Sequence, residues 1–381
     1  MLVLCALPAM GAGMSTPTSI TTPEGYTVVS ASTWEDFKNY STTNDVAFKV
    51  DSVEGGVVLD GLSTNLKGGS GTWYITSSDA GNLSSLSISN ASTRIFSFGS
   101  LIVENLGSLT ASGISFTEYS DYNGGALGYL IGSNAFNNNG SLSFSDNSRY
   151  YSTRGNGGVF LVSGNGSLAF TSNNDVSFDG NTASSTRNDT SGGAIYGKRG
   201  AVVSFADNKN LSFTDNKVFT VQGSNAYVTA YAPMGGALYI AGSEEGGSAT
   251  NGEGGIAITG NDSVVFQGNI SEANFDEQSA YDCYGGAIYT GNGTSINISE
   301  NGSLKFIENK AQSIAINGTY SSGNTFGGAL AAGAGATVQL NANDEVLFQG
   351  NESLSSSEGY PISSIHSIIL PALLYPTEHF L

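Results

Sequence analysis

The feature that most constrains the fold is an alternation of two short motifs along the chain. One is Gly-Gly-Ala followed by Ile or Leu, and the other is Phe-x-x-Asn. Self-similarity of this kind indicates a repeat protein, whose units stack on their neighbours instead of sharing one central core. The first motif occurs at Gly124-Gly125-Ala126, Gly192-Gly193-Ala194, Gly235-Gly236-Ala237, Gly285-Gly286-Ala287 and Gly327-Gly328-Ala329, with a weaker copy at Gly157-Gly158. The second occurs at Phe144 and Asn147, Phe178 and Asn181, Phe205 and Asn208, Phe213 and Asn216, Phe266 and Asn269, Phe306 and Asn309, and Phe348 and Asn351.

The residues around these motifs predict short β-strands. Leu304 and Phe306 flank Lys305, so the apolar side chains share one face of a strand and the lysine takes the other. The glycines favour backbone angles that other residues avoid, or a close approach of a neighbouring coil. The asparagines are expected to hydrogen-bond turn backbone and to stack as a ladder between coils.

The spacing of the glycine motif favours a solenoid over a propeller. Its copies begin at residues 124, 157, 192, 235, 285 and 327, which is regular without being strict. A solenoid accommodates such differences as surface loops, whereas propeller blades are more uniform. We therefore predict an all-β, right-handed parallel β-helix with irregular N-terminal coils.

Composition excludes several classes of function. The chain has 381 residues, of which 52 are glycine and 12% are charged, and its formal net charge is -19. Such a charge argues against a basic surface for nucleic acid. The glycine-rich stretch 252–255 lacks the Lys-Ser/Thr ending of a phosphate-binding loop. We expect no cofactor and no small-molecule substrate.

Catalysis is not expected either. Both histidines, His366 and His379, lie beyond the repeats, so the repeat region lacks an imidazole for a nucleophilic triad or a zinc site. The alternative is a β-helix enzyme that acts on polysaccharides through clustered carboxylates, with Asp175, Asp179 and the pair Glu244-Glu245 as candidates. The cysteines, Cys5 and Cys283, define no disulfide framework.

Four segments are predicted along the chain. Residues 1–13 resemble the remnant of a signal peptide, because the apolar start lacks basic residues. Residues 14–115 lack the motifs and are expected to form an irregular N-terminal cap region. Residues 116–358 carry the repeats, and residues 359–381 form a tail of different composition. No segment has the apolar length of a membrane helix.

One insertion is a candidate contact loop. The segment from Val218 to Met234 is long and contains Tyr227 and Tyr231. Tyrosine is enriched at interface hot spots, although packing within strands and turns is the alternative explanation for these rings.

Together, the interleaved motifs resemble the paired signature of the chlamydial polymorphic outer membrane proteins. The resemblance covers residues 124–351. It implies a β-helical autotransporter passenger, at the cell outer membrane, on the cell surface or secreted. It also implies adhesion to a host-cell surface protein or glycan, and antigenic variation.

Departures from the family pattern define further expectations. We expect a truncated or frameshifted member without the C-terminal barrel, so that a remnant without retained function is a further alternative. An open end of the β-helix is expected to favour self-association, because it leaves strand edges unpaired.

Overall fold

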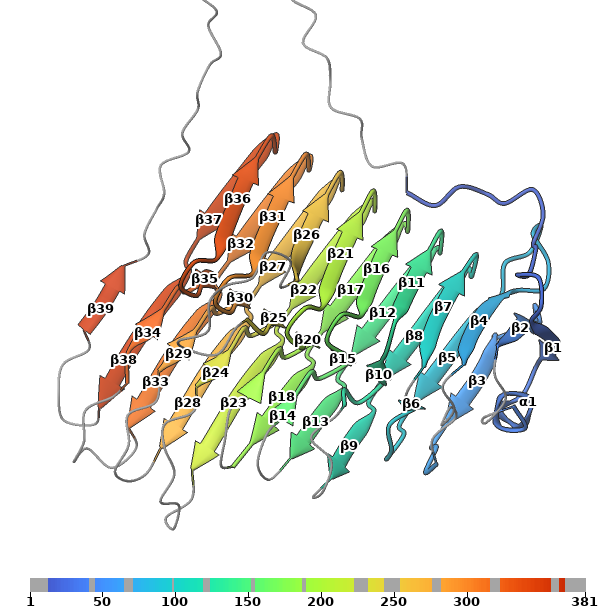
Figure 1. Cartoon of the computed structure of the whole chain (residues 1–381), viewed down its shortest axis with the longest axis horizontal. Helices are drawn as coiled ribbons and strands as arrows, with labels where there is room; N and C mark the ends of the chain where they lie inside the picture. Colours follow the sequence, from blue (N-terminus) through green and yellow to red (C-terminus); the bar gives the residue numbers. More distant parts are fainter. Residues whose placement is uncertain are drawn as a thin grey trace, which may run out of the picture.

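The protein is a long stack of β-coils. Its computed structural model describes residues 13–40, 45–64, 71–97, 99–118, 124–151, 155–186, 190–222, 232–242, 254–275, 282–315, 323–357 and 363–366. Within these ranges there are one short helix and 39 strands, and the strands form five sheets that extend along the stack (Figure 1). All strand pairs are parallel except β38 with β39, which confirms the predicted parallel β-helix.

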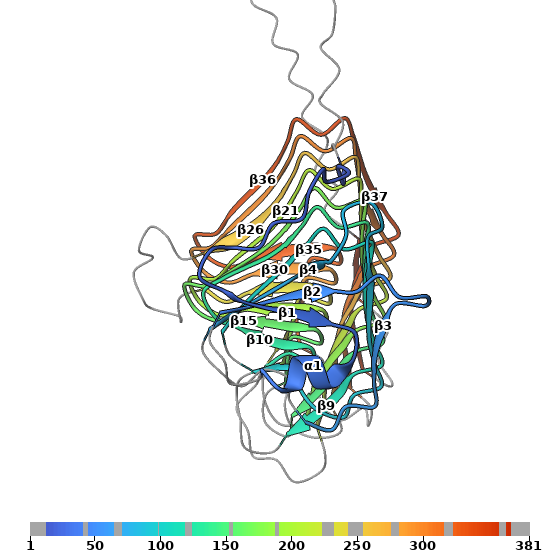
Figure 2. The ribbon, with the colours of Figure 1, turned by 90° about the vertical axis from the view of Figure 1, so that its right-hand side faces the viewer.

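A complete coil visits the five sheets in a fixed order, which we label A, B, D, E and C. One such coil consists of β16 (Ser167–Thr171), β17 (Asp175–Asp179), β18 (Thr182–Ser185), β19 (Thr190–Ser191) and β20 (Ile195–Gly197). The chain then enters sheet A again at β21 (Val202–Ala206). Viewed along the stack, sheets A and B meet at a narrow corner (Figure 2).

Within each sheet, every strand except the two at its ends pairs with the strand of the preceding coil and with the strand of the following coil. Sheet A contains β1 (Thr27–Ala31), β2 (Val46–Val50), β4 (Thr72–Ser77), β7 (Ser100–Glu104), β11 (Ser133–Asn137), β16, β21, β26 (Gly255–Thr259), β31 (Ser295–Ser299) and β36 (Thr337–Asn341). Sheet B contains β3 (Val57–Asp60), β5 (Ser85–Ser89), β8 (Ser108–Ser112), β12 (Ser141–Ser145), β17, β22 (Asn210–Thr214), β27 (Ser263–Gln267), β32 (Ser303–Ile307) and β37 (Glu345–Gln349).

The other three sheets are shorter. Sheet C contains β6 (Phe96–Ser97), β10 (Gly128–Leu130), β15 (Phe160–Val162), β20, β25 (Leu238–Ile240), β30 (Ile288–Thr290) and β35 (Leu330–Ala332). Sheet D contains β9 (Ser115–Glu118), β13 (Ser148–Tyr151), β18, β23 (Lys217–Gln222), β28 (Ile270–Phe275), β33 (Lys310–Ala315), β38 (Glu352–Ser357) and β39 (Ser363–His366). Sheet E contains β14 (Gly155–Asn156), β19, β24 (Pro233–Met234), β29 (Cys283–Tyr284) and β34 (Thr325–Phe326).

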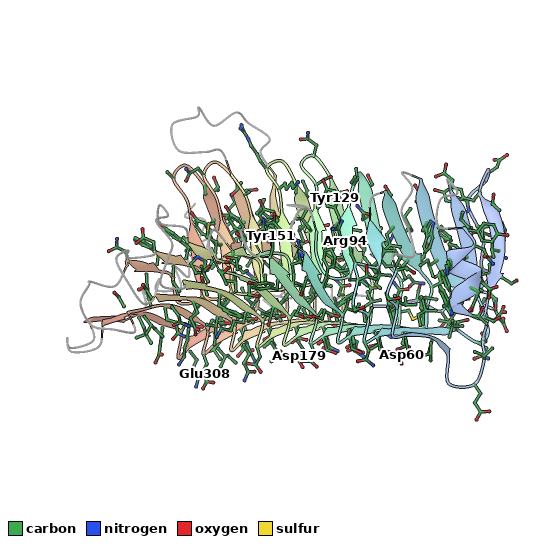
Figure 3. The ribbon with its side chains drawn as sticks, turned by 90° about the horizontal axis from the view of Figure 1, so that it is seen from below. Asp60, Arg94, Tyr129, Tyr151, Asp179 and Glu308 are labelled. Carbon is green, nitrogen blue, oxygen red and sulfur yellow. The ribbon has the colours of Figure 1, made fainter. Side chains whose placement is uncertain are left out.

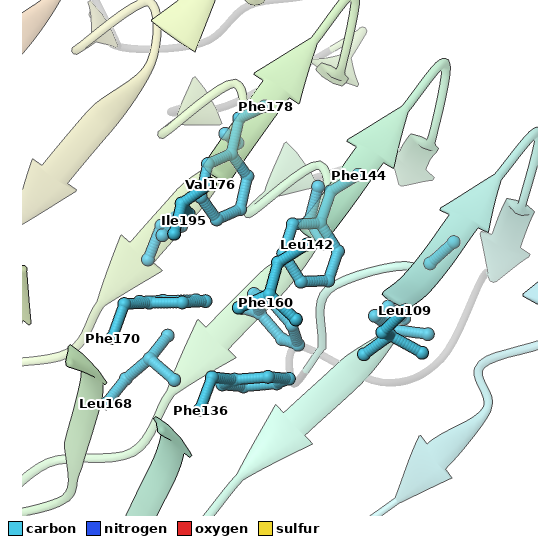
Figure 4. Close-up of a cluster of buried hydrophobic side chains, with 14 of the residues drawn as sticks. Leu109, Phe136, Leu142, Phe144, Phe160, Leu168, Phe170, Val176, Phe178 and Ile195 are labelled. Atoms are coloured by element: carbon cyan, nitrogen blue, oxygen red, sulfur yellow. The ribbon is translucent and has the colours of Figure 1, made fainter. Parts of the chain in front are cut away.

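The main core lies between sheets A, B and C and is built from stacked identical side chains. Pairing in register places Phe178 on Phe144 and on Phe213, with ring centroids 4.8 and 4.9 Å apart. A second phenylalanine stack, through Phe136 and Phe170, faces it from sheet A (Figure 4). The period-two pattern explains this arrangement, since alternate side chains of each strand point into the core.

The first coils differ from the rest, as predicted. In the described residues, sheet C begins at β6, sheet D at β9 and sheet E at β14, so the earliest coils pair mainly in sheets A and B. Pairing in sheets A, B and D nevertheless continues across residue 115, where a domain boundary is predicted. The four-segment division remains a prediction.

The two ends of the stack are different. At the N-terminal end, α1 (Trp34–Lys38) packs Phe37 against Phe48 and Trp73, with ring centroids 4.6 and 6.0 Å apart. At the C-terminal end, β39 covers the edge of β38 in sheet D. The last coil exposes Phe326, Val338, Val346 and Phe348, whose counterparts in earlier coils are packed under the next coil.

Candidate functional site

The asparagines of the Phe-x-x-Asn motif form a buried ladder at the corner between sheets B and D. Asn181 donates its backbone N–H and its Nδ2–H to Oδ1 of Asn216, at 3.2 and 2.9 Å. Its Nδ2 also donates to the carbonyl of Phe144, 2.8 Å away. The same bonds link the other members of this ladder, which are Asn147, Asn269, Asn309 and Asn351.

A second asparagine ladder lies at the corner between sheets A and B. It includes copies of the Phe-x-x-Asn motif that were not identified from the sequence. Asn208 belongs to this ladder and not to the first, because Phe205 lies in sheet A. Its neighbours Asn139 and Asn173 complete Phe-x-x-Asn motifs with Phe136 and Phe170. Further along, the ladder continues through Asn261, Asn301 and Asn343, where Ile or Leu replaces the phenylalanine.

The residue before each ladder asparagine has a left-handed backbone. Between sheets B and D these residues are Asp146, Gly180, Asp215, Gly268, Glu308 and Gly350, with φ between 51° and 65°. Acidic residues and glycine alternate at this position. The acidic side chain of one coil extends over the backbone of the next coil, where glycine leaves room for it. A Cβ on Gly180 would lie 2.8 Å from Oδ1 of Asp146, and two consecutive acidic residues would therefore compete for one space.

The Gly-Gly-Ala motif builds the corner between sheets E and C. The first glycine has a positive φ, such as 62° at Gly192 and 66° at Gly235. A Cβ on the second glycine would overlap the carbonyl oxygen of its counterpart in the next coil, as for Gly193 against Gly236. The following alanines are almost fully buried. Apart from the last coil, where Phe348 is exposed, the side chains of both motifs are therefore buried inside the stack.

One long connection, residues 241–254, joins sheet C to sheet A, but the other connections of variable length in the repeat region lie at one edge of the stack. They connect sheet D to sheet E and range from residues 152–154 in one coil to residues 223–232 in another. Because the strands of sheet D pair in register, the ends of β13, β18, β23 and the strands after them form a row (Figure 1). Tyr227 and Tyr231 fall in this row of connections, in a stretch outside the described residues.

Other tyrosines pack against one another. Tyr196, Tyr239 and Tyr289 stack on successive coils, with ring centroids 5.5 and 5.3 Å apart. Tyr284 stacks on Tyr289 and on Phe326, at 5.0 and 4.9 Å. Neighbouring rings therefore cover the faces of these tyrosines in sheets C and E, whereas the two explanations for Tyr227 and Tyr231 concern residues outside the described ranges.

Carboxylate side chains lie at or just after the C-terminal ends of several strands of sheet B. Asp60, Asp179 and Glu308 lie along the same side of the stack (Figure 3). Desolvation, together with the charges of Asp215 and Asp146, raises the pKa of Asp179 above its ordinary value of 3.8. Asp175, at the other end of β17, accepts a hydrogen bond from Asn210 at 2.8 Å. Glu244 and Glu245 lie outside the described residues.

The described residues provide little reactive chemistry elsewhere. They contain no group of three or more His, Cys, Asp or Glu side chains placed to hold a metal ion. Cys283 is fully buried as a free thiol, and burial raises its pKa. In the same residues, no helix has the length and apolar character needed to span a bilayer.

Comparison with known proteins finds one similarity. The sequence model described as Chlamydia polymorphic membrane protein repeat matches residues 175–198 and 263–291. Each match begins in sheet B and runs through sheets D and E and the Gly-Gly-Ala corner into sheet C. No curated protein and no solved structure matches the chain.

Proposed function

Because the chain belongs to the chlamydial polymorphic membrane protein family, we propose that it acts as a surface-displayed passenger that attaches to host cells. It works without catalysis, and its variable loops supply antigenic variation. Its partner is a host-cell surface protein or glycan.

The observation that carries this proposal is the separation of constant from variable residues. The two motifs lie inside the coil, where they hold backbone and core together. The connections between sheets D and E differ in length from coil to coil while the strands on either side keep their register. A scaffold that holds variable loops in a row is the usual way in which a rigid fold supports recognition.

The longest of these connections is the best candidate for contact. It joins β23 to β24 and carries Tyr227 and Tyr231, which would supply large contact area at low entropic cost. Its flanking strands remain paired with β18 and β28 in sheet D and with β19 in sheet E. The loop can therefore be shortened without removing a strand.

The test is attachment of the purified chain to host cells. Residues 223–231 are replaced by residues 187–189, the short connection of the preceding coil, and residues 276–281 are replaced in the same way as a matched control. We expect the first replacement to abolish attachment and the control to retain it. If both variants and the unchanged chain attach equally well and give the same β-rich circular dichroism, the loop is not part of the binding surface.

Self-association at the C-terminal end is a second part of the proposal. The last coil exposes 44% of Phe326 and 41% of Phe348, and within the described residues β36 is the last strand of sheet A. Apolar side chains and unpaired strand edges on one face favour contact with another chain.

A further inference from the structure

An extended segment near the start of the chain lies across the corner between sheets A and B. We call residues 13–22 the strap. The N–H of Met14 donates to Oδ1 of Asn174 at 2.9 Å, and the N–H of Ser15 donates to Oδ1 of Asn138 at 2.7 Å. The N–H of Gly13 donates to the carbonyl of Asp207 at 3.2 Å. These partners follow three consecutive strands of sheet A, so the strap runs along the stack.

The corner binds the strap mainly through backbone atoms. Nδ2 of Asn138 donates to the carbonyl of Ser15 at 3.0 Å, while Oδ1 of Asn138 accepts the N–H of Ser15. One side-chain amide thus takes both polar groups of one residue, as a neighbouring β-strand would. The side chain of Asn138 is itself oriented by Oδ1 of Asn105, 2.6 Å from its Nδ2.

These amides are separate from the buried ladder, which uses Asn139 and Asn173. On coils beyond the strap, the position of Asn138 is taken by Gly260, Glu300 and Ala342. The position of Asn174 is taken by Lys209, Asp262, Gly302 and Asp344. Among the coils that the strap contacts, only Asn138 and Asn174 carry amides at these outer positions, and the coils further along the stack carry none there.

We propose that Asn138 and Asn174 form a binding site for an extended peptide backbone, which the strap occupies in cis and the same segment of a second copy can occupy in trans. The bonds between Ser15 and Asn138 are exposed to solvent, so water competes with them and each contributes little. Exchange between copies preserves every bond, which is the condition that makes swapping of an identical element inexpensive in free energy.

The probe is a fluorescein-labelled peptide with the sequence of residues 13–22, titrated with the full chain and followed by fluorescence anisotropy. In the chain, Ser15→Pro removes the N–H that Asn138 accepts and so weakens the strap in cis while leaving the site intact. We expect this variant to bind the peptide more tightly than the unchanged chain does.

Loss of the site is tested in the Ser15→Pro chain by adding Asn138→Ser and Asn174→Ala. Serine is chosen because Ser172 holds the same left-handed position on the next coil, with φ of 55°. Removing the four hydrogen bonds that Asn138 and Asn174 make with the strap should weaken peptide binding about tenfold or more. Glu300→Ser, at the equivalent position away from the strap, is the matched control and should leave binding unchanged.

Two results would overturn the proposal. One is equal peptide binding by the Ser15→Pro chain with and without the two asparagine substitutions, and the other is no binding by the Ser15→Pro chain. Circular dichroism of each variant separates loss of the site from loss of the fold. A peptide that itself carries Ser15→Pro lacks the N–H that Asn138 accepts and should bind the Ser15→Pro chain more weakly than the unchanged peptide does.

Discussion

At the scale of single residues, each repeated side chain has a coil-building task. The ladder asparagines satisfy backbone groups that the tight corners leave without partners, and burial makes those groups costly to leave unpaired. The left-handed residue before each asparagine turns the corner, and the acidic residue at this position covers the next coil. The sequence pattern therefore encodes geometry more than recognition.

Replacing a ladder asparagine should destabilise the stack strongly. Asn216→Ala removes the acceptor for the N–H and Nδ2 of Asn181 and the donor to the carbonyl of Phe178. We expect a loss of about 2–4 kcal/mol, because buried groups are left unsatisfied. Urea unfolding measures it. Asn210→Ala, on the exposed side of β22, is the control and should change stability by less than about 0.5 kcal/mol.

Substitution of Asp179 should have an effect that depends on pH. The raised pKa means that the folded chain binds this proton more tightly than the unfolded chain, so ionisation costs stability as pH rises through and above the ordinary value of 3.8. Asp179→Asn should therefore raise the melting temperature at pH 7 and leave it unchanged well below that value. Because Asp179 is exposed, the gain should be small and should shrink with added salt. A gain that grows on acidification would contradict the assignment.

At the scale of elements, the sequence predicted the strands and the kind of contact that the corners make, but it located only part of the second asparagine ladder. Alternation such as Leu304, Lys305 and Phe306 predicts a strand directly, and both motifs were placed in the coil from the sequence. The ladder between sheets A and B was missed at Asn261 and Asn301 because isoleucine replaces phenylalanine there, and it was missed at Asn139 and Asn173 although both complete the motif. The strap contacts could not be predicted either, since Ser15 and Asn138 meet only after the coils have stacked.

The short helix α1 is expected to close the N-terminal end of the core. Phe37→Ala removes the ring that packs on Phe48 and Trp73, at a cost of about 3–5 kcal/mol for a buried aromatic side chain. In a stack of coils this loss stays local, because each coil contacts only its neighbours. Hydrogen exchange should therefore speed up in β2 and β4 and stay unchanged in β27 and β32. The exposed change Glu35→Ala should affect neither region.

At the scale of the whole molecule, one end is closed and the other presents apolar side chains. The net charge of -19 opposes association of copies, so self-association should strengthen as salt screens that charge. Replacing Val346 and Phe348 by lysine should abolish it, as measured by sedimentation over a range of concentrations. Val202→Lys, on an equally exposed residue of β21, should leave it intact. Association that survives the double substitution would place the contact elsewhere.

The most direct test compares motif and loop in one assay of host-cell attachment. Phe178→Leu with Phe213→Leu alters two motif copies, and leucine or isoleucine already serves at the equivalent sheet A positions Ile258 and Leu340. If recognition resides in the loops, this folded variant attaches as well as the unchanged chain, while replacement of residues 223–231 abolishes attachment. Loss of attachment by the folded leucine variant, with full attachment by the loop variant, would contradict a scaffold role for the motifs.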